Sequence, residues 1–361
     1  MSIISSILQK EEFSREDIIS LLSIEEPELI EELRSEAERV LYRYRGPNVY
    51  FRGLVEFSNI CSSDCYYCGI RKSNSQVERY LISKEEIVEC ALWCAKQGYG
   101  SIVLQSGERQ DKKFTDFVTD AVRSIKKATR SERLPQGLGI TLCVGEQSRE
   151  VYQDFFDAGA HRYLLRIEAS DKELFSFIHP SNQSFDSRES CLRILKEIGY
   201  LVGTGVMIGL PGQSLEHLAD DILFFKKAGV DMIGMGPFIV HEQTPFSTYK
   251  DETRLETNFL NTLKMIAVTR LVLKDVNIAA TTALQAIQHD GREQGLKFGA
   301  NVVMPQITPE KFRKQYLLYA GKPCIDENAE LCKACLTRRI QSVGRSVAID
   351  IWGDRRPVQK G

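Results

Sequence analysis

Residues 49–69 read VYFRGLVEFSNICSSDCYYCG and join a strand-forming run directly to three closely spaced cysteines. The first nine residues of this stretch are rich in β-branched and aromatic side chains, which favours a β-strand. Similar short runs recur along the chain and alternate with amphipathic stretches, a pattern typical of strand-helix units around a parallel sheet. Eight such runs begin at residues 49, 101, 139, 162, 202, 232, 277 and 301.

Eight strand-helix units predict an α/β protein built on a TIM-type (β/α)8 barrel, over residues 47–320. In such a barrel the chemistry gathers at the carboxyl ends of the strands. Residues 1–46 carry apolar residues at helical spacing and predict an N-terminal helical region that covers one end of the barrel. Residues 321–361 follow the last predicted strand and are expected to be a loop-rich extension that holds a second group of cysteines.

Local signals inside the predicted barrel mark the ends of elements. Ser83 and Glu86 have the spacing of a capping box and predict a helix over residues 84–97, which Gly98 then ends. The polar stretch of residues 126–137 predicts a surface loop.

The composition is that of an ordinary globular protein. Of 361 residues, 43% are hydrophobic and 27% are charged, and the formal net charge is −2. A chain so close to neutral gives no electrostatic reason to expect nucleic acid or a membrane surface as partner, and no segment approaches the length of a membrane span. Without a secretory signal, we expect a cytoplasmic protein with a small-molecule partner. The ten cysteines are then better explained by metal binding or burial than by disulfides.

Cys61, Cys65 and Cys68 follow the first predicted strand with the spacing Cys-x3-Cys-x2-Cys. Three thiolates can hold three irons of a 4Fe-4S cluster and leave the fourth iron without a protein ligand. The alternatives are three buried free thiols or half of a zinc site. Zinc would require a fourth cysteine or histidine nearby, and none lies between Ser58 and Tyr80. The pattern therefore favours a cluster with one open iron.

This loop, with an aromatic residue before its last cysteine, resembles the radical S-adenosylmethionine superfamily. The resemblance implies that Cys61, Cys65 and Cys68 are catalytic, because the cluster binds S-adenosylmethionine and cleaves it to methionine and a 5′-deoxyadenosyl radical. Ser106 stands where members usually have the first glycine of a Gly-Gly-Glu-like turn. The resemblance implies that Glu168 contacts the ribose of the cofactor and that Arg188 contacts its methionine carboxylate. The alternative for each of these residues is a surface salt bridge. The cofactor contacts that the resemblance implies are Tyr67, Gln105, Ser106, Gly107, Glu108, Glu168 and Arg188.

From about residue 8 to residue 352 the chain resembles the HydE family of maturases of the FeFe-hydrogenase. The resemblance rests on the joint order of segments such as EFSNICSSDCYYCGIRKSN, AGAHRYLLRIE, GMGPFIVHEQTP and GANVVMPQITP. Within it, Cys324, Cys332 and Cys335 have the spacing of an accessory cluster site that varies among members, for a 2Fe-2S or a 4Fe-4S centre. The alternatives are a structural zinc site or free thiols.

The same resemblance implies a substrate and partners. The substrate would be a small cysteine-bound Fe(II) that carries CO and cyanide, made by another hydrogenase maturase, and the adenosyl radical would attack its cysteine sulfur. A reductant protein of ferredoxin or flavodoxin type would supply electrons. The candidate substrate contacts are Arg162, Arg166, Met232, Thr281, Thr282, Tyr316 and Tyr319.

Two pairs among these candidates have alternative interpretations. Arg162 and Arg166 fall on one face of the fourth predicted strand, so both are expected to point into the barrel. Their alternative is an outward ion pair with a helix, since barrel strands are normally apolar on both faces. For Tyr316 and Tyr319 the alternative is core packing.

Other functions stay open at this stage. A methylornithine synthase or a biotin synthase shares the barrel and the first motif, but the former has no reason to keep the second cysteine group. Biotin synthase needs a sacrificial cluster inside the barrel. A HydE-like protein that serves a different metallocofactor is hardly separable from a true maturase by sequence. An iron–sulfur carrier would not explain a whole barrel around the first motif.

Overall fold

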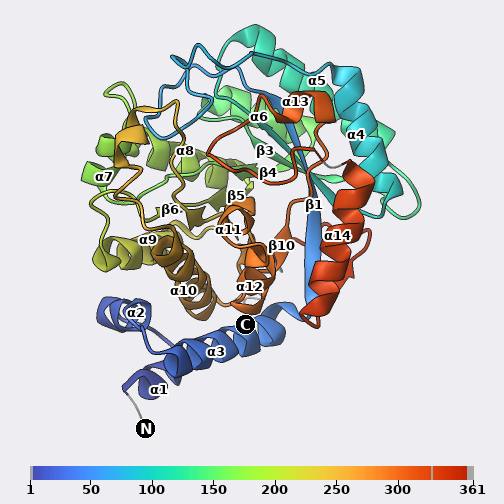
Figure 1. Ribbon diagram of the computed structural model, residues 1–361. Helices are drawn as coiled ribbons and strands as arrows, with labels where there is room; N and C mark the ends of the chain where they lie inside the picture. Colours follow the sequence, from blue (N-terminus) through green and yellow to red (C-terminus); the bar gives the residue numbers. More distant parts are fainter. Residues whose placement is uncertain (1–2, 327, 356–361) are drawn as a thin grey trace.

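The computed structural model describes residues 3–326 and 328–355, and its centre is a curled sheet of parallel strands (Figure 1). The order of the strands follows the chain, which is what repeated strand-helix units produce. Along the sheet the order is β10 (Val302–Val303), β1 (Asn48–Ser58), β2 (Ser101–Ser106), β3 (Gly139–Cys143), β4 (Ala160–Leu164), β5 (Leu201–Thr204), β7 (Met232–Ile233) and β9 (Asn277–Ile278).

The two ends of this strand order meet at one parallel bridge, between Ala279 and Val302. There the amide of Ala280 donates to the carbonyl of Val302 at 2.9 Å, and the amide of Asn301 donates to the carbonyl of Ile278 at 2.9 Å. Three short strands lie outside this order, two of them in a separate two-stranded sheet and one beside β1. β6 (Met207–Ile208) pairs with β8 (Gly236–Pro237), and β11 (Ser346–Ala348) pairs with the start of β1.

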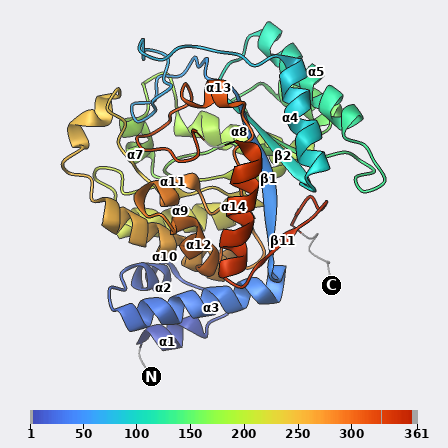
Figure 2. The ribbon, with the colours of Figure 1, turned by 45° about the vertical axis from the view of Figure 1, so that its right-hand side comes forward.

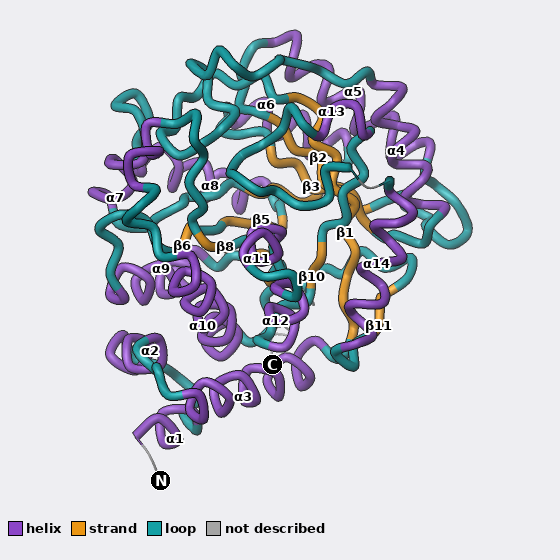
Figure 3. The backbone as a smooth tube through the Cα atoms, in the orientation of Figure 1, coloured by secondary structure: helices purple, strands orange, loops and turns teal. Residues whose placement is uncertain are grey.

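Helices surround the strands on the outside of the curl (Figure 3). Their ends follow local chemistry: Ser83 and Glu86 form the predicted capping box, and Gly159, Gly199 and Gly229 end helices in the left-handed conformation that glycine adopts without strain. The helices between strands are α4 (Lys84–Lys96), α5 (Lys112–Ala128), α6 (Arg149–Ala158), α7 (Lys172–Ile178), α8 (Phe185–Ile198), α9 (Leu215–Ala228), α10 (Leu255–Leu273), α11 (Thr282–Ile287) and α12 (Gly291–Lys297), with the 3-10 helix η1 (Pro245–Tyr249). No helix in the described ranges is long and apolar enough to cross a membrane.

The N-terminal residues form three helices, α1 (Ile3–Leu8), α2 (Arg15–Leu22) and α3 (Pro27–Arg45). Figures 1 and 2 show them grouped at the end of the molecule where β1 begins. Lys264 of α10 fixes this group, because its buried ammonium donates to the carbonyls of Leu22 at 2.6 Å and Ile24 at 3.0 Å. These donations satisfy carbonyls at the end of α2 that the helix itself leaves unpaired.

Two predicted loops differ from the structure. The stretch expected to be a loop at residues 126–137 begins inside α5, which runs to Ala128. The extension expected to be loop-rich contains β11 and a helix of 14 residues, α14 (Ala329–Ser342). Asn328 caps the first turn of this helix. α13 (Glu310–Arg313) precedes it. Residues 1–2 of the predicted N-terminal region and residues 356–361 of the predicted extension lie outside the described residues.

Residues 351–355, the base segment, close the end of the sheet where the strands begin. The carbonyl of Trp352 accepts from Ser101 at 3.0 Å and from Arg162 at 3.0 Å. The Trp352 ring stacks on His161 with centroids 4.4 Å apart. Arg162 is completely buried, and its charge pairs with Asp354. That ion pair is therefore the electrostatic contact that joins the base segment to β4.

Removal of the Asp354 carboxylate should destabilise the fold. In Asp354→Ala the buried Arg162 charge loses its partner, and we expect a loss of about 3 kcal/mol in the free energy of unfolding by urea. This value is at the low end of the usual range for breaking a buried ion pair, because the Asp354 side chain is 27% exposed. Asp116→Ala, which breaks an exposed pair with Lys112, should change stability by less than about 0.5 kcal/mol. Equal losses in the two variants would contradict this role for Asp354.

Candidate functional site

One cavity of about 310 Å³ opens at the carboxyl ends of the strands. This is the end at which barrels of this kind carry their chemistry, and the volume suits a small molecule. Most of the residues predicted as site residues line it. They are Cys61, Cys65, Cys68, Tyr67, Gln105, Ser106, Gly107, Glu108, Arg166, Glu168, Arg188, Thr281, Thr282, Tyr316, Tyr319 and Cys324.

The cysteine loop after β1 has little regular structure, so its backbone is held by side chains. Asn59 donates to the carbonyls of Glu78 and Gln315, both at 2.8 Å, and accepts from the amide of Tyr80 at 2.8 Å. Arg79 donates to several loop carbonyls, which include that of Ile70 at 2.8 Å. These contacts satisfy backbone groups that a strand or helix would otherwise pair, and sequence reasoning missed both residues.

Burial governs the three thiols of this loop. It raises the pKa of Cys61, raises that of Cys65 well above its usual range, and raises that of Cys68 to about 12. Thiolates at these positions therefore require positive charge, which bound iron would provide. The turn after β2 already offers one compensating dipole, because the amide of Glu108 donates to the Cys61 sulfur at 3.3 Å.

The cysteine loop offers three thiols, a donor set that suits an iron–sulfur cluster. Three thiols that face one cavity from a single loop match the ligand set of a cubane with one open iron. The residues present therefore fit the predicted cluster.

The turn after β2 lies directly against the cysteine loop. The amide of Gly107 donates to the carbonyl of Ser58 at 2.9 Å, and a Cβ at Gly107 would stand only 2.5 Å from the carbonyl oxygen of Ile60. Only glycine fits this approach. The Glu108 carboxylate accepts from Ser63 at 2.7 Å, so it fastens the turn to the loop.

Glu168 and Arg188 lie in the cavity, so the alternative of surface salt bridges does not apply to them. The Glu168 carboxylate pairs with Arg166 at 2.7 Å, and its backbone has a φ of 63°, in the left-handed region that only glycine adopts readily. Arg188 donates to Glu146 at 2.5 Å and to the carbonyl of Arg166 at 2.6 Å. Burial alone would lower the pKa of Arg188, but Glu146 and Glu108 raise it above its usual value.

Asp221 of α9 supports the segment that carries Glu168. Its carboxylate accepts from the amide of Ser170 at 2.7 Å. Because the side chain is buried away from cations, burial raises the pKa of Asp221 to about 7. This carboxyl is a third residue that the sequence did not reveal, since nothing in the helix pattern distinguishes it from a surface acid.

The expectation that Arg162 and Met232 face the substrate is wrong. Arg162 is enclosed at the base of the sheet, where it also donates to Ser101 at 2.7 Å. The Met232 sulfur accepts from the buried Arg52 at 2.7 Å. Arg162 lies within β4, whereas Arg166 lies two residues beyond the end of β4 at Leu164. Arg166 therefore reaches the cavity beyond the end of β4, whereas Arg162 does not.

The other substrate candidates line the cavity and form polar contacts there. Thr282 and Tyr319 share a hydrogen bond of 2.7 Å between their hydroxyls. The Gln105 amide donates to the Tyr316 hydroxyl at 3.4 Å. Tyr316 is buried and also lines the cavity, so it packs in the core as well as forming part of the cavity wall.

The second cysteine group is divided between α14 and the cavity wall. Cys332 and Cys335 are on α14, and Cys324 lies at the edge of the cavity. Contact with Cys324 is the largest cause of the raised pKa of Cys332. Two arginines point at the sulfurs: Arg292 donates to Cys324 at 3.6 Å, and Arg339 donates to Cys335 at 3.3 Å.

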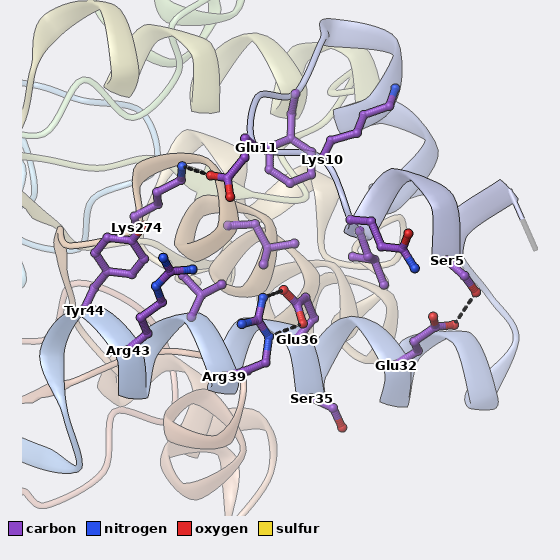
Figure 4. Close-up of a pocket in the computed structure, with 15 residues that line it drawn as sticks. Ser5, Lys10, Glu11, Glu32, Ser35, Glu36, Arg39, Arg43, Tyr44 and Lys274 are labelled. Atoms are coloured by element: carbon purple, nitrogen blue, oxygen red, sulfur yellow. Dashed lines mark hydrogen bonds and ion pairs between the residues drawn. The ribbon is translucent and has the colours of Figure 1, made fainter.

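A separate hollow lies between α1, α3 and α10 (Figure 4). Its charged residues are mostly paired with one another, for example Lys274 with Glu11 at 2.9 Å and Arg39 with Glu36. Figure 4 shows both pairs, with Arg39 and Glu36 side by side on α3. None of the predicted site residues lines it, so it is not the candidate site.

Comparison with known proteins gives relatives over most of the chain. Residues 55–225 match the family model described as the Radical SAM superfamily. The [FeFe] hydrogenase maturase subunit HydE of Thermotoga maritima is 42% identical over 97% of this chain and 96% of its own length. The 3-methylornithine synthase of Methanosarcina acetivorans is 29% identical over 82% of this chain and 80% of its own.

Solved structures agree with the fold. The crystal structure of methylornithine synthase (PylB) superposes with a TM-score of 0.80 at 26% identity and covers 97% of this chain and 98% of its own. The structure of HydG, a maturase of the [FeFe]-hydrogenase, superposes with a TM-score of 0.77 over 96% of this chain and 75% of its own. At 17% identity the latter shows a shared fold alone.

Gly107→Ala should displace the cysteine loop. The added Cβ would overlap the Ile60 carbonyl, so we expect anaerobic reconstitution to incorporate less iron at the loop, by roughly half or more. Gly234→Ala is the matched control, because Gly234 also lines the cavity but has no atom within 4 Å of its Cβ position. Iron per chain measures the outcome, and equal iron in both variants would refute the close approach.

Asp221→Asn should change how stability depends on pH. The folded-state pKa of Asp221, about 7, lies above the unfolded value, so the buried carboxyl ionises at a cost as pH rises from about 4 to 7. The asparagine keeps the acceptor for Ser170 without that cost. Its thermal unfolding midpoint should approach that of the wild type near pH 4 and exceed it by a growing margin up to about pH 7, above which the difference stays constant. Parallel curves across this range would contradict the burial of an ionisable carboxyl.

Proposed function

Because this chain belongs to the radical S-adenosylmethionine superfamily and, within it, to the HydE family of FeFe-hydrogenase maturases, we propose that it acts on a small cysteine-bound iron carbonyl cyanide precursor of the hydrogenase cluster. The enzyme class follows from the family. The substrate is the part that we propose. One observation carries it: the cysteine loop, Glu168, Arg188 and the polar substrate candidates all line the same cavity.

The cofactor side of the cavity divides into ligands and positioning groups. Cys61, Cys65 and Cys68 would hold the 4Fe-4S cluster. When bound, this cluster supplies the electron that cleaves S-adenosylmethionine to methionine and a 5′-deoxyadenosyl radical. Arg188 would bind the methionine carboxylate, because its guanidinium is buried in the cavity and stays charged. Glu168 would accept from the ribose hydroxyls while Arg166 holds its carboxylate in place.

The remaining cofactor candidates shape the wall. Tyr67 is partly buried and lines the cavity, and its ring packs edge-on against His179, with centroids 5.6 Å apart. Its backbone would lie beside the adenine. Gln105, Ser106, Gly107 and Glu108 form the turn against the loop, and the Ser106 hydroxyl donates to the Gly107 carbonyl at 2.8 Å. The Ser106 hydroxyl therefore uses the Gly107 carbonyl as a hydrogen-bond acceptor, whereas a glycine at position 106 would leave that carbonyl free.

The substrate side offers donors to an anionic molecule. Arg166, Thr281, Thr282, Tyr316 and Tyr319 line the cavity, and cationic and hydroxyl groups suit an iron complex that carries cyanide and a carboxylate. Enclosure of these groups by the strands and the residues after β10 keeps bulk water away from a reactive radical. In this proposal these side chains orient the substrate sulfur toward the cofactor.

Further parts of the proposal concern the periphery. Cys324, Cys332 and Cys335 would hold an accessory 2Fe-2S or 4Fe-4S cluster, supported by the two arginines that point at their sulfurs. A ferredoxin or flavodoxin would be the reductant, and another maturase would deliver the substrate in the cytoplasm. The bridge between β9 and β10 supports a complete (β/α)8 barrel, with a helical region before residue 47 and an extension after residue 320.

Similarity to methylornithine synthase favours a second candidate. A radical enzyme of that subgroup would share the barrel and the cysteine loop, and the structural match has a TM-score of 0.80. The identity of 29% over 82% of the chain is lower than that to the maturase, and the accessory cysteines have no place in that function. A HydE-like protein that serves another metallocofactor is the remaining variant of the proposal.

The reaction is tested by reductive cleavage of the cofactor. Holoenzyme with dithionite and S-adenosylmethionine should release 5′-deoxyadenosine, and Cys68→Ser should reduce that release by about 100-fold or more because a cluster ligand is lost. Cys90→Ser is the matched control, because Cys90 is a half-buried thiol of α4 outside the cavity. The three proteins are compared by chromatography of the product.

The substrate is tested in the same reaction mixture. With the cysteine-bound iron carbonyl cyanide complex added, freeze-quenched EPR should show a new radical signal that depends on both the complex and the cofactor. Release of 5′-deoxyadenosine without such a signal would keep the enzyme class and contradict the proposed substrate. No release, with equal iron in wild type and Cys68→Ser, would overturn the assignment of the cluster.

A further inference from the structure

Five polar side chains that the proposed reaction does not explain as a group form one wall of the cavity. They come from segments that are far apart in the sequence: β1, β2, the residues just after β10, and the stretch between α13 and α14. They are Glu56, Gln105, Gln306, Tyr316 and Lys322. At the centre of this wall is an ion pair between Glu56 and Lys322.

The ion pair is almost completely buried and is held on each side. The Lys322 ammonium lies 2.5 Å from the Glu56 carboxylate, and the two side chains are 5% and 2% exposed. Lys322 also donates to the carbonyl of Tyr316 at 2.9 Å and lies 5.1 Å from the centroid of that ring. Gln306 donates to the second oxygen of Glu56 at 2.7 Å.

Both charged groups keep unused hydrogen-bonding capacity, and both line the cavity. An ammonium has three N–H donors, and the contacts of Lys322 use two of them. A carboxylate has about four acceptor positions, and Glu56 uses one on each oxygen. A donor and an acceptor of opposite full charge therefore stand side by side on the wall.

A buried ion pair needs a reason beyond stability. The cost of removing two charges from water often exceeds their attraction, so apolar residues of the same size would hold β1 and the residues after α13 together as well or better. At a cavity wall, paired opposite charges also select a ligand. Glu56 would repel a simple anion and Lys322 a simple cation, whereas a zwitterion satisfies both.

We propose that Glu56 and Lys322 form a subsite for an α-amino acid, in which Glu56 accepts from the ammonium and Lys322 donates to the carboxylate. The inference deepens the proposed function, because it assigns the place at which the amino acid part of a cysteine-bound substrate is held. It is distinct from the methionine end of the cofactor. Arg188, the group proposed for that end, pairs with Glu146 and packs near β4, and β2 and β3 separate β4 from β1 in the sheet.

The test uses the holoenzyme with saturating S-adenosylmethionine and three thioether probes. S-methyl-L-cysteine carries both charges, 3-(methylthio)propionate lacks the ammonium, and 2-(methylthio)ethylamine lacks the carboxylate. A thioether avoids the thiolate ligation of iron that cysteine itself would give. Calorimetric titration should show that S-methyl-L-cysteine binds roughly tenfold or more tightly than either probe with one charge, because each loses a charge-assisted hydrogen bond.

Variants separate recognition from structure. Lys322→Met or Glu56→Gln alone leaves an unpaired buried charge and should lower the unfolding midpoint. The double variant carries neither charge, so it should regain most of that stability and bind S-adenosylmethionine, yet bind S-methyl-L-cysteine roughly tenfold or more weakly. Lys311→Met, at an exposed lysine that pairs with Glu86 outside the cavity, is the control for loss of a lysine.

The outcomes are decisive in either direction. Equal affinity of wild type for all three probes, no binding of S-methyl-L-cysteine, or undiminished binding by the double variant would overturn the subsite and leave the pair as a structural tether. If the double variant does not fold, the probe series on wild type decides alone. Failure of the proposed function would be seen separately, as absence of 5′-deoxyadenosine, which the binding measurement does not require.

Discussion

The structure depends on how one irregular loop is held against its neighbours. The loop after β1 presents three thiols to a cavity and has no helix or strand around them, so its backbone groups need other partners. Asn59 and Arg79 supply these from within the loop, and the turn at Gly107 supports it from β2 at a distance that admits no side chain. The parallel sheet makes this possible, because adjacent strands end side by side at the same edge.

Electrostatics organises the rest of the cavity around this loop. The thiols lie where burial opposes their ionisation, so the site is suited to bound iron. Arg188 and Glu168 are each paired with a protein group of opposite charge, which fixes their orientation before any ligand binds. The Glu56 and Lys322 pair repeats this arrangement on another wall of the cavity. Preformed pairs of this kind keep charged side chains ordered in a site that must exclude water.

The sequence predicted the features that are written in local pattern. Strand runs, the capping box at Ser83 and the spacing of Cys61, Cys65 and Cys68 each depend on neighbours in the chain, and the structure has these strands and this helix. The local sequence does not show how far along a strand a residue lies from the cavity. Arg162 was therefore expected beside Arg166, but it lies at the base of the sheet. α14 was not predicted because only a narrow face of it is apolar, with Cys332, Leu336 and Ile340 buried. Polar residues at alternate positions of β1 indicated that Glu56 could face the inside of the barrel, whereas no pattern in the sequence indicated the position of Lys322.

The central claim is that three loop thiols leave one iron open for the cofactor. Electron-nuclear double resonance on the reduced holoenzyme, with S-adenosylmethionine labelled with ¹⁷O in its carboxylate, tests this directly. We predict a hyperfine coupling between the label and the cluster spin, because the carboxylate would bind the iron that no cysteine holds. A cluster signal without any coupling to the label would mean that every iron is already ligated, and it would contradict the claim.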